Sequence, residues 1–277
     1  MEELHSKFIQ QRAAYIEENF KIQIQQRVQV LSKVNKMIDH TLLQSDITPE
    51  QIARLCSEAK EHGFASVCVN GCYCDMACEL LRGSDVMVCC VAGFPLGAAT
   101  TEAKVFETRD LISRGADEID VVINCAWMKA NMYSDVHREL CLVVNACHEK
   151  QRVVKVIIET ACLQTPELIV DACMLCQAAG ADFVKTSTGM HKLGGATPEH
   201  VLLIRTVAGK ACGVKAAGGV RDLRSAALML ECGANRIGTS SGVNIAKEAK
   251  EKSEAQLQEI VEQARKEASE LMQKLPN

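Results

Sequence analysis

The sequence predicts a (β/α)8 barrel, and three observations carry that prediction. Short apolar runs rich in valine, isoleucine and cysteine alternate with stretches of helical spacing from about Asp39 onward. The runs number eight, as a closed barrel of this kind requires. The runs are mostly apolar and do not alternate apolar with polar residues, as expected for parallel strands buried on both faces. The dinucleotide-binding fingerprint G-x-G-x-x-G is absent, which disfavours an open doubly wound sheet.

The elements follow in order along the chain. Strands are predicted within 36–43, 65–70, 86–95, 118–124, 153–160, 182–189, 213–220 and 235–242. The segment 48–63 illustrates the helices between them, because its apolar residues at 52, 55, 56 and 59 share one face. Thr48 and Pro49 form a typical helix start, and Gly63 a typical stop.

Two segments fall outside the predicted barrel of residues 36–243. Residues 1–35 are rich in glutamine and are predicted to form a helical extension. Residues 244–277 are predicted to form a charged helix that packs on the barrel or on a neighbouring subunit. Its apolar residues recur every three or four positions, at Leu257, Val261, Ala264, Ala268, Leu271 and Leu275.

Composition narrows the class of protein. Of 277 residues, 48% are hydrophobic and the net charge is −4, which indicates a folded chain and disfavours nucleic-acid binding through a basic face. No apolar run reaches the roughly 18 residues that a membrane span needs. The first residues, MEELHSKFIQQRAAY, are partly acidic and lack the apolar stretch of a secretory signal. We therefore expect a cytoplasmic protein that binds neither nucleic acid nor membrane.

The 15 cysteines are expected to be free thiols. The densest cluster, Cys68, Cys72, Cys74 and Cys78, contains no C-x2-C pair of the kind that binds zinc. We interpret these residues as small buried apolar side chains and expect no metal site.

Two lysines, Lys185 and Lys215, lie near the ends of the sixth and seventh predicted strands. Adjacent parallel strands are about 4.8 Å apart, so the two amines are expected to come close. Their repulsion in a partly dry barrel mouth should lower the pKa of at least one from its usual value near 10.4. A neutral amine can attack a carbonyl and form a Schiff base, which acts as an electron sink. A snorkelling or ion-paired lysine is the alternative interpretation of either residue taken singly.

Carboxylates accompany the lysines on other predicted strands. Asp120 and Asp39 could each pair with a lysine and transfer a proton. Glu118 lies nearer the start of its strand and is interpreted as a residue of a cap or of the opposite barrel face. Glu159 and Lys155 are interpreted as a structural pair.

The last two strands end in glycines and serines that suit a phosphate site. Gly218 and Gly219 allow close approach of a ligand to the backbone, and Ser240 and Ser241 add hydroxyl groups. Gly189 could supply a further amide. Loops after the seventh and eighth strands commonly bind phosphate in this fold. Ordinary glycine turns are the alternative.

Seven motifs together carry a family resemblance: IDHTLL, GFPLG, GADEIDVVIN, KVIIET, ADFVKTSTG, VKAAGGVRD and RIGTSSG. From about Asp39 to Gly242 the chain resembles the deoxyribose-phosphate aldolases, which are class I aldolases. The resemblance implies reversible cleavage of 2-deoxy-D-ribose 5-phosphate to D-glyceraldehyde 3-phosphate and acetaldehyde. It also implies no metal, no organic cofactor, and assembly as a homodimer or homotetramer.

The resemblance implies a role for each matching residue. Lys185 would form the Schiff base, Lys215 would perturb it, Asp120 would transfer protons, and Asp39 would assist through a relay or the substrate hydroxyls. Positions that match substrate contacts are Thr41, Cys68 and Thr188. Positions that match the phosphate site are Gly189, Gly218, Gly219, Ser240 and Ser241.

Two departures stand out against the family pattern. Met190 follows the TSTG glycine where some members carry a lysine, and this chain lacks the C-terminal tyrosine of some members. Other functions stay open as alternatives. One is another phosphate-binding barrel aldolase or isomerase, and the other is a barrel without catalysis that serves as a scaffold.

Overall fold

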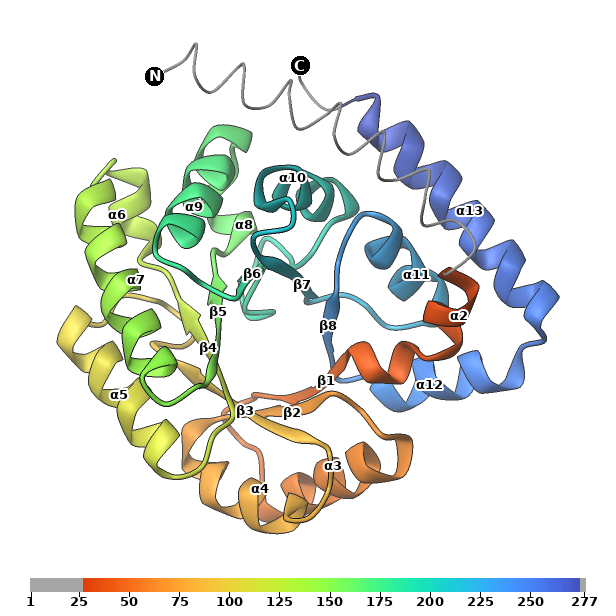
Figure 1. Cartoon of the computed structure of the whole chain (residues 1–277), viewed down its shortest axis with the longest axis horizontal. Coiled ribbons are helices and arrows are strands. Elements are labelled where there is room, and N and C mark those ends of the chain that lie inside the picture. The colour runs from red at the N-terminus through yellow and green to blue at the C-terminus, as the bar shows by residue number, and fades with distance from the viewer. Residues whose placement is uncertain (1–26, 275–277) are drawn as a thin grey trace.

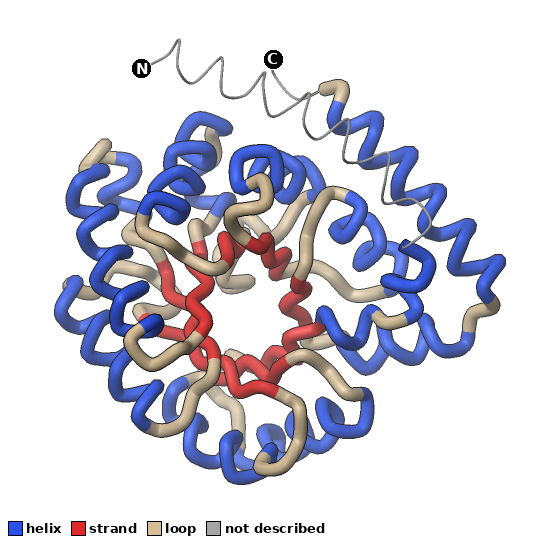
Figure 2. The backbone as a smooth tube through the Cα atoms, viewed as in Figure 1, coloured by secondary structure: helices blue, strands red, loops and turns tan. Residues whose placement is uncertain are grey.

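The computed structural model describes residues 27–274, and its centre is a closed barrel of eight parallel strands in sequential order. The strands form the inner ring in Figure 2. Their bounds are β1 Ile38–Leu42, β2 Ser66–Val69, β3 Met87–Ala92, β4 Glu118–Val122, β5 Val153–Ile157, β6 Phe183–Lys185, β7 Gly213–Ala217 and β8 Arg236–Thr239. The predicted (β/α)8 fold is confirmed, and each strand falls within its predicted segment.

Helices surround the barrel, as Figure 1 shows. The main ones are α3 Pro49–His62, α4 Cys74–Leu81, α5 Thr101–Ser113, α7 Tyr133–His148, α9 Pro166–Ala178, α10 Pro198–Ala208, α11 Leu223–Glu231, α12 Gly242–Glu251 and α13 Glu254–Met272. Shorter elements are α2 Arg27–Ser32, η2 Val34–Met37, η3 Gly71–Tyr73, α6 Cys125–Lys129 and α8 Thr160–Leu163. None of the helices in the described part of the chain is both long and apolar enough to cross a membrane.

Local sequence explains how α3 begins and ends. The Gln51 side chain accepts a hydrogen bond from the Thr48 backbone N–H at 2.8 Å, and Pro49 occupies the first turn. Gly63 ends the helix with φ of +61°, in the left-handed region that glycine enters without strain. The four apolar residues predicted to share one face are all buried. The prediction for 48–63 is therefore confirmed.

Strand register decides which side chains share a height in the barrel. Lys185 is directly opposite Lys215 on β7, and Asp120 is directly opposite Lys155 on β5. Strand β6 is shorter than predicted, because residues 186–189 belong to the loop 186–197, in which Gly189 has φ of +80°. The loop therefore follows immediately after Lys185, at the carboxyl end of the barrel where active sites of this fold lie.

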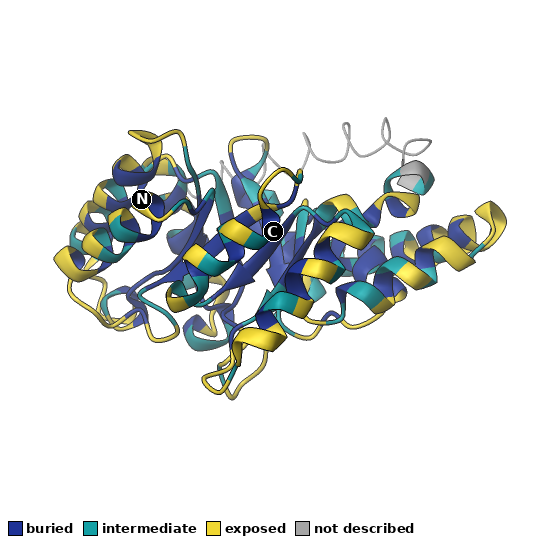
Figure 3. Ribbon diagram, turned by 90° about the horizontal axis from the view of Figure 1, so that it is seen from below, coloured by how far each residue is buried: buried dark blue, intermediate teal, exposed yellow. Residues whose placement is uncertain are grey.

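The C-terminal segment forms two helices, α12 and α13, which Lys252 and Ser253 separate. In Figure 1, α13 runs along α11 and α2 at the edge of the helical ring. Its predicted apolar stripe is buried at Leu257, Val261, Ala264 and Ala268. Figure 3 shows the same pattern for the ring as a whole, with buried faces toward the strands and exposed faces outward. Leu275 and residues 1–26 lie outside the described residues, so the predicted extension there is untested.

Candidate active site

Asp120 on β4 lies at the centre of three lysines from three other strands. Its Oδ2 accepts hydrogen bonds from Lys185 Nζ and Lys215 Nζ, each at 2.7 Å, and its Oδ1 accepts one from Lys155 Nζ at 2.8 Å. Asp120 and Lys155 are fully buried, and Lys185 is 2% exposed. One carboxylate thus links β5, β6 and β7 inside the barrel.

The three ammonium groups determine the ionisation of Asp120. Burial by itself would raise the pKa of this carboxyl group, since the charged form loses its water. Lys155, Lys185 and Lys215 more than offset that effect and hold the pKa of Asp120 well below its ordinary value. Asp120 is therefore an ionised hydrogen-bond acceptor in contact with three amines at once.

Asp39 on β1 forms a second bridge. Its Oδ2 lies 2.5 Å from Lys215 Nζ and 3.8 Å from Lys155 Nζ. Its Oδ1 accepts from two nitrogens of Arg236 on β8, with Nε at 2.8 Å. Burial opposes ionisation, but the cations outweigh burial and lower the pKa of Asp39. The structure thus brings Asp39, Asp120, Lys185 and Lys215 into one network.

The lysine pair behaves differently from the sequence-based expectation of direct repulsion. Both amines bind the same oxygen of Asp120, so a negative charge lies between them. Burial would lower the pKa of Lys215, but Asp120 and Asp39 outweigh burial and raise that pKa above its ordinary value. The expected fall in pKa therefore does not occur at Lys215, because two buried carboxylates bind that amine.

Lys155 and Glu118 are functional candidates that sequence reasoning missed. Lys155 does not pair with Glu159; its Nζ lies 2.6 Å from Glu118 Oε2 as well as 2.8 Å from Asp120. Glu118 is buried inside the barrel and binds Arg236, so it is no cap, and as the first residue of β4 it lies at the opposite end of the barrel, the predicted alternative. The signal that could have found both is strand alternation. Lys155 is opposite Asp120 in register, and Glu118 precedes Asp120 by two residues and so shares its face.

Glu159 instead holds the loop that follows Lys185. Its Oε2 accepts hydrogen bonds from the Thr188 backbone N–H at 3.1 Å and from the Thr188 hydroxyl. The Thr188 hydroxyl in turn accepts from the Met190 N–H at 3.0 Å. Glu159 has φ of +50°, a left-handed conformation unusual for a residue with a Cβ. This strained residue shapes the turn that carries Thr188 and Gly189.

Glycines at the ends of β6 and β7 pack backbone to backbone. A Cβ on Gly218 would lie 3.2 Å from the Gly189 Cα and 3.0 Å from the Gly195 Cα, and all three residues lack room for a side chain or have positive φ. Gly219 also has a positive φ, of +93°. The predicted phosphate-site glycines Gly189 and Gly218 are therefore neighbours, and Gly195 joins them as a residue that the sequence analysis did not name.

The remaining predicted contacts lie around the same end of the barrel. Ser240 and Ser241 follow β8, and Ser241 directly precedes α12, whose N-terminus favours anions. Together with Thr41 they line a groove of about 510 Å³ that also borders α3 and α12. The Thr41 hydroxyl donates to the Asp39 carbonyl at 2.8 Å, so this residue is adjacent to the network through its backbone.

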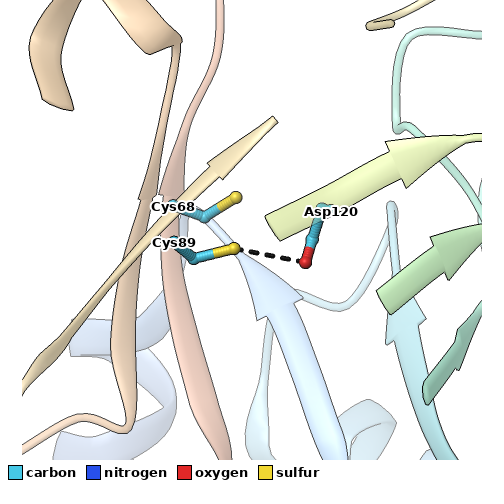
Figure 4. A group of neighbouring side chains, drawn as sticks. All are labelled: Cys68, Cys89 and Asp120. Atoms are coloured by element: carbon cyan, nitrogen blue, oxygen red, sulfur yellow. Dashed lines mark hydrogen bonds between the residues drawn. The ribbon is translucent and has the colours of Figure 1, made fainter. Parts of the chain in front are cut away.

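Cys68 lies inside the barrel, where it forms a group with Cys89 and Asp120 (Figure 4). Single ligand atoms from the three residues lie within 4.8 Å of one another, close enough for a metal ion. The site fits a cation poorly, because Lys155, Lys185 and Lys215 already bind both oxygens of Asp120. Burial also raises the pKa of Cys89 well above its ordinary value, which keeps that thiol protonated.

The predicted cysteine cluster does not behave as one group. Cys68 faces the barrel interior, whereas Cys74 and Cys78 belong to α4. Cys72 is exposed and Cys78 is only partly buried, so the expectation that all four are buried is wrong at those two positions.

The part of the chain that carries the site residues is similar to known aldolases. The DeoC/LacD family aldolase model matches residues 33–248. A deoxyribose-phosphate aldolase of Geobacillus sp. (strain WCH70) is 56% identical over 214 residues, which span 77% of this chain and 95% of that relative. One from Streptococcus uberis is 54% identical over 213 residues, spanning 77% of this chain and 95% of the relative.

Solved structures agree with the sequence relatives. A putative deoxyribose-phosphate aldolase from Coccidioides immitis superimposes with a TM-score of 0.76 at 40% identity, covering 79% of this chain and 87% of that one. The deoxyribose phosphate aldolase from Aeropyrum pernix, described as a unique tetrameric structure, gives a TM-score of 0.76 at 33% identity, covering 84% and 98%. With its barrel, its buried lysines and these relatives, the chain belongs to the DeoC/LacD family of aldolases.

Proposed function

We propose that this aldolase cleaves 2-deoxy-D-ribose 5-phosphate reversibly to D-glyceraldehyde 3-phosphate and acetaldehyde, with Lys185 as the Schiff-base residue. The observation that carries the assignment is the shared oxygen of Asp120. Lys185 and Lys215 each lie 2.7 Å from Asp120 Oδ2, and Lys185 is the one followed directly by the loop at the open end of the barrel. Close relatives at more than half identity bear the corresponding activity in their names.

Lys185 would begin the reaction as a nucleophile. Its unprotonated amine adds to the C1 aldehyde of the open-chain sugar, and loss of water leaves an iminium ion. Lys215 is held in its charged form by Asp120 and Asp39, as its raised pKa indicates. We therefore assign Lys215 the role of a fixed positive charge that favours loss of the proton from Lys185.

Asp120 would move the protons in the bond-breaking step. Cleavage of the C2–C3 bond requires loss of the proton on the C3 hydroxyl, which becomes the aldehyde of glyceraldehyde 3-phosphate. The electron pair of the broken bond passes into the iminium group and gives an enamine. Protonation at C2 and hydrolysis then release acetaldehyde and return the free lysine. Asp39 and Lys155, both in contact with the network, would complete the relay.

The opposite end of the substrate would be held by backbone groups. Gly189 and Gly218 are neighbours, and Ser240 and Ser241 precede α12, so we assign the phosphate dianion to the amides and hydroxyls of these residues. Gly219, Thr41, Thr188 and Cys68 would line the path from this cradle to Lys185. This chain has Met190, 42% exposed, beside the cradle, which gives phosphate no cation at that position.

Assembly and compartment are further parts of the proposal. We assign a homodimer or homotetramer in the cytosol. Phe106 on α5 is 74% exposed and Leu142 on the neighbouring α7 is 43% exposed, as expected of helices that meet a second copy. Free buried thiols such as Cys68, Cys74 and Cys89 suit a reducing compartment. Light scattering coupled to size exclusion checks the assembly, and a monomer at micromolar concentration would contradict it.

Reductive trapping tests the chemistry directly. The protein is incubated with 2-deoxyribose 5-phosphate, reduced with sodium borohydride, digested and mapped by mass spectrometry. A reduced adduct on the peptide with Lys185, absent in Lys185→Met and present in Lys104→Met, supports the assignment. Lys104 is a suitable control because it is equally buried but belongs to α5. A folded protein without an adduct, or with its adduct on Lys215, would overturn the role of Lys185.

A further inference from the structure

Two charged residues lie beneath the proposed active site, toward the amino ends of the strands. Glu118 is the first residue of β4 and Arg236 is the first residue of β8. Substrates of βα barrels bind at the carboxyl ends, so neither residue is placed to touch the sugar. Glu118 is nevertheless buried, and the Arg236 side chain is only 14% exposed. Charged groups are rarely buried this far without a purpose that offsets the loss of hydration.

Arg236 holds two carboxylates at once. It donates from Nη1 and Nη2 to the two oxygens of Glu118, at 3.1 and 2.9 Å. It donates from Nε and Nη2 to Oδ1 of Asp39, with Nε at 2.8 Å. Because Oδ1 of Asp39 is engaged from below, Oδ2 is the oxygen that faces Lys215, at 2.5 Å.

Glu118 acts in the same way on the other carboxylate, through Lys155. Its Oε2 lies 2.6 Å from Lys155 Nζ. Lys155 Nζ then donates to Oδ1 of Asp120 at 2.8 Å. Since Oδ1 of Asp120 is engaged, Oδ2 is left for both Lys185 and Lys215. Asp39 and Asp120 therefore each have one oxygen held from beneath, by Arg236 and Lys155 respectively. The other oxygen of each faces the amines near the substrate site.

Glu118 and Arg236 also contribute to the charge of the network. The bases of the whole network are Lys155, Lys185, Lys215 and Arg236, and its acids are Asp39, Glu118 and Asp120. Full ionisation gives four positive charges against three negative ones. Loss of one proton makes the buried set neutral, which low polarity favours. Glu118 and Arg236 contribute opposite charges to this balance.

We propose that Glu118 and Arg236 are positioning residues that orient Asp39 and Asp120 and set how readily the network gives up the proton that leaves Lys185 unprotonated. The proposal rests on the proposed function of Lys185. Every strand contributes a titratable group that faces this interior: Asp39, Cys68, Cys89, Glu118 and Asp120, Lys155, Lys185, Lys215 and Arg236. Among the charged groups of the described residues that face this interior, Glu118 and Arg236 are the two that begin their strands at the amino ends, away from the expected sugar site.

The pH profile of kcat/KM tests the idea, because the two residues carry opposite charges. Glu118→Gln removes a negative charge and keeps the shape, so the acid limb should move by about one unit to lower pH. Arg236→Gln should move it by about one unit to higher pH. Arg236→Lys keeps the positive charge but loses the planar guanidinium that binds Asp39 and Glu118 together. The acid limb of the profile should therefore stay in place while kcat falls.

A double variant guards against failure to fold. Glu118→Gln/Arg236→Gln restores the balance of charge, and its acid limb should return close to that of the natural protein. Glu139→Gln is the matched control, a buried carboxylate paired with Lys104 in the helical ring, and should leave the limb unmoved. Equal shifts in both single variants, or none in folded protein, would show a purely structural role and overturn the proposal. Trapping on Lys185 in the natural protein tests the proposed function separately.

Discussion

Two buried ionic groups in this molecule have opposite electrostatic character. One is the network in the barrel interior around Asp120. The other is the pair between Lys104 on α5 and Glu139 on α7, whose atoms Nζ and Oε1 lie 2.6 Å apart. Both side chains of the pair are as inaccessible as those of the network, with 0% and 1% exposure. Burial alone therefore does not distinguish the two regions.

The pKa directions do distinguish them. In the helical pair, burial dominates: it raises the pKa of Glu139 and lowers that of Lys104, despite their mutual attraction. In the barrel, several opposite charges outweigh burial, so the pKa of Asp120 falls and the pKa of Lys215 rises. One oppositely charged partner is too few to offset dehydration, whereas two partners suffice at Lys215 and three at Asp120. The barrel network can thus hold stable charges and still exchange a proton, while the pair serves packing.

Replacement of the central lysine of each region should separate chemistry from stability most sharply. Lys185→Met should lower kcat on the order of 10⁴-fold or more, because no other amine replaces the nucleophile. Lys104→Met should retain kcat per folded molecule. Steady-state assays with protein whose folding is checked by circular dichroism measure both. Comparable losses in the two variants would remove the distinction between the regions.

Lys104→Met should leave activity intact but reduce the stability of the protein strongly. Lys104→Met leaves Glu139 buried without its cation and takes the donor from the Val122 carbonyl, which Lys104 binds at 2.9 Å. The free energy of unfolding should fall by about 3–5 kcal/mol. Urea denaturation at pH 7 measures it, with exposed Lys129→Met on α6 as the surface control. A loss under 1 kcal/mol would mean that Glu139 readily takes up a proton or water.

Acid titration should reveal the lowered pKa of the barrel carboxylates. The pKa of Asp39 in the folded protein lies below its unfolded value near 3.9. Its contribution is therefore complete above that value and is lost as pH falls through the folded pKa. Unfolding free energies from pH 6 to pH 3 should decline for the natural protein and decline less for Asp39→Asn, with a difference on the order of 2 kcal/mol. Parallel curves would contradict the lowered pKa.

Glu139 provides the opposite slope within the same experiment. Its raised pKa means that its favourable contribution is present at low pH and is lost as pH rises through the folded pKa. Glu139→Gln should therefore steepen the overall decline toward acid, whereas Asp39→Asn flattens it.

The smallest effect is expected when both members of the helical pair become apolar. Lys104→Met/Glu139→Met should be within about 1 kcal/mol of the natural protein or more stable, since two dehydrated charges are removed together. The coupling energy from the single and double variants measures the interaction. A double variant as unstable as Lys104→Met would show that the pair contributes more than its dehydration costs.

The fold was largely predictable because it depends on periodicity. Eight apolar runs and the helix signals between them depend on short-range spacing, which the chain displays directly, as at Thr48 and Gly63. The lysines were also conspicuous, since an ammonium group within an apolar strand is unusual. Lys155 and Glu118 were missed because each resembles an ordinary charged residue until strand register brings it against Asp120.

By itself, the sequence determined the order of strands and helices and marked Lys185, Lys215, Asp120 and Asp39 as candidates, since those inferences need only local pattern and chemistry. Only the tertiary structure decided that Asp120 lies between the amines, that Lys155 turns to Glu118, and that Arg236 closes the network from beneath. The physical reason is closure of the barrel. It brings residues up to 197 positions apart within hydrogen-bonding distance, and their charges set one another's ionisation only at that range.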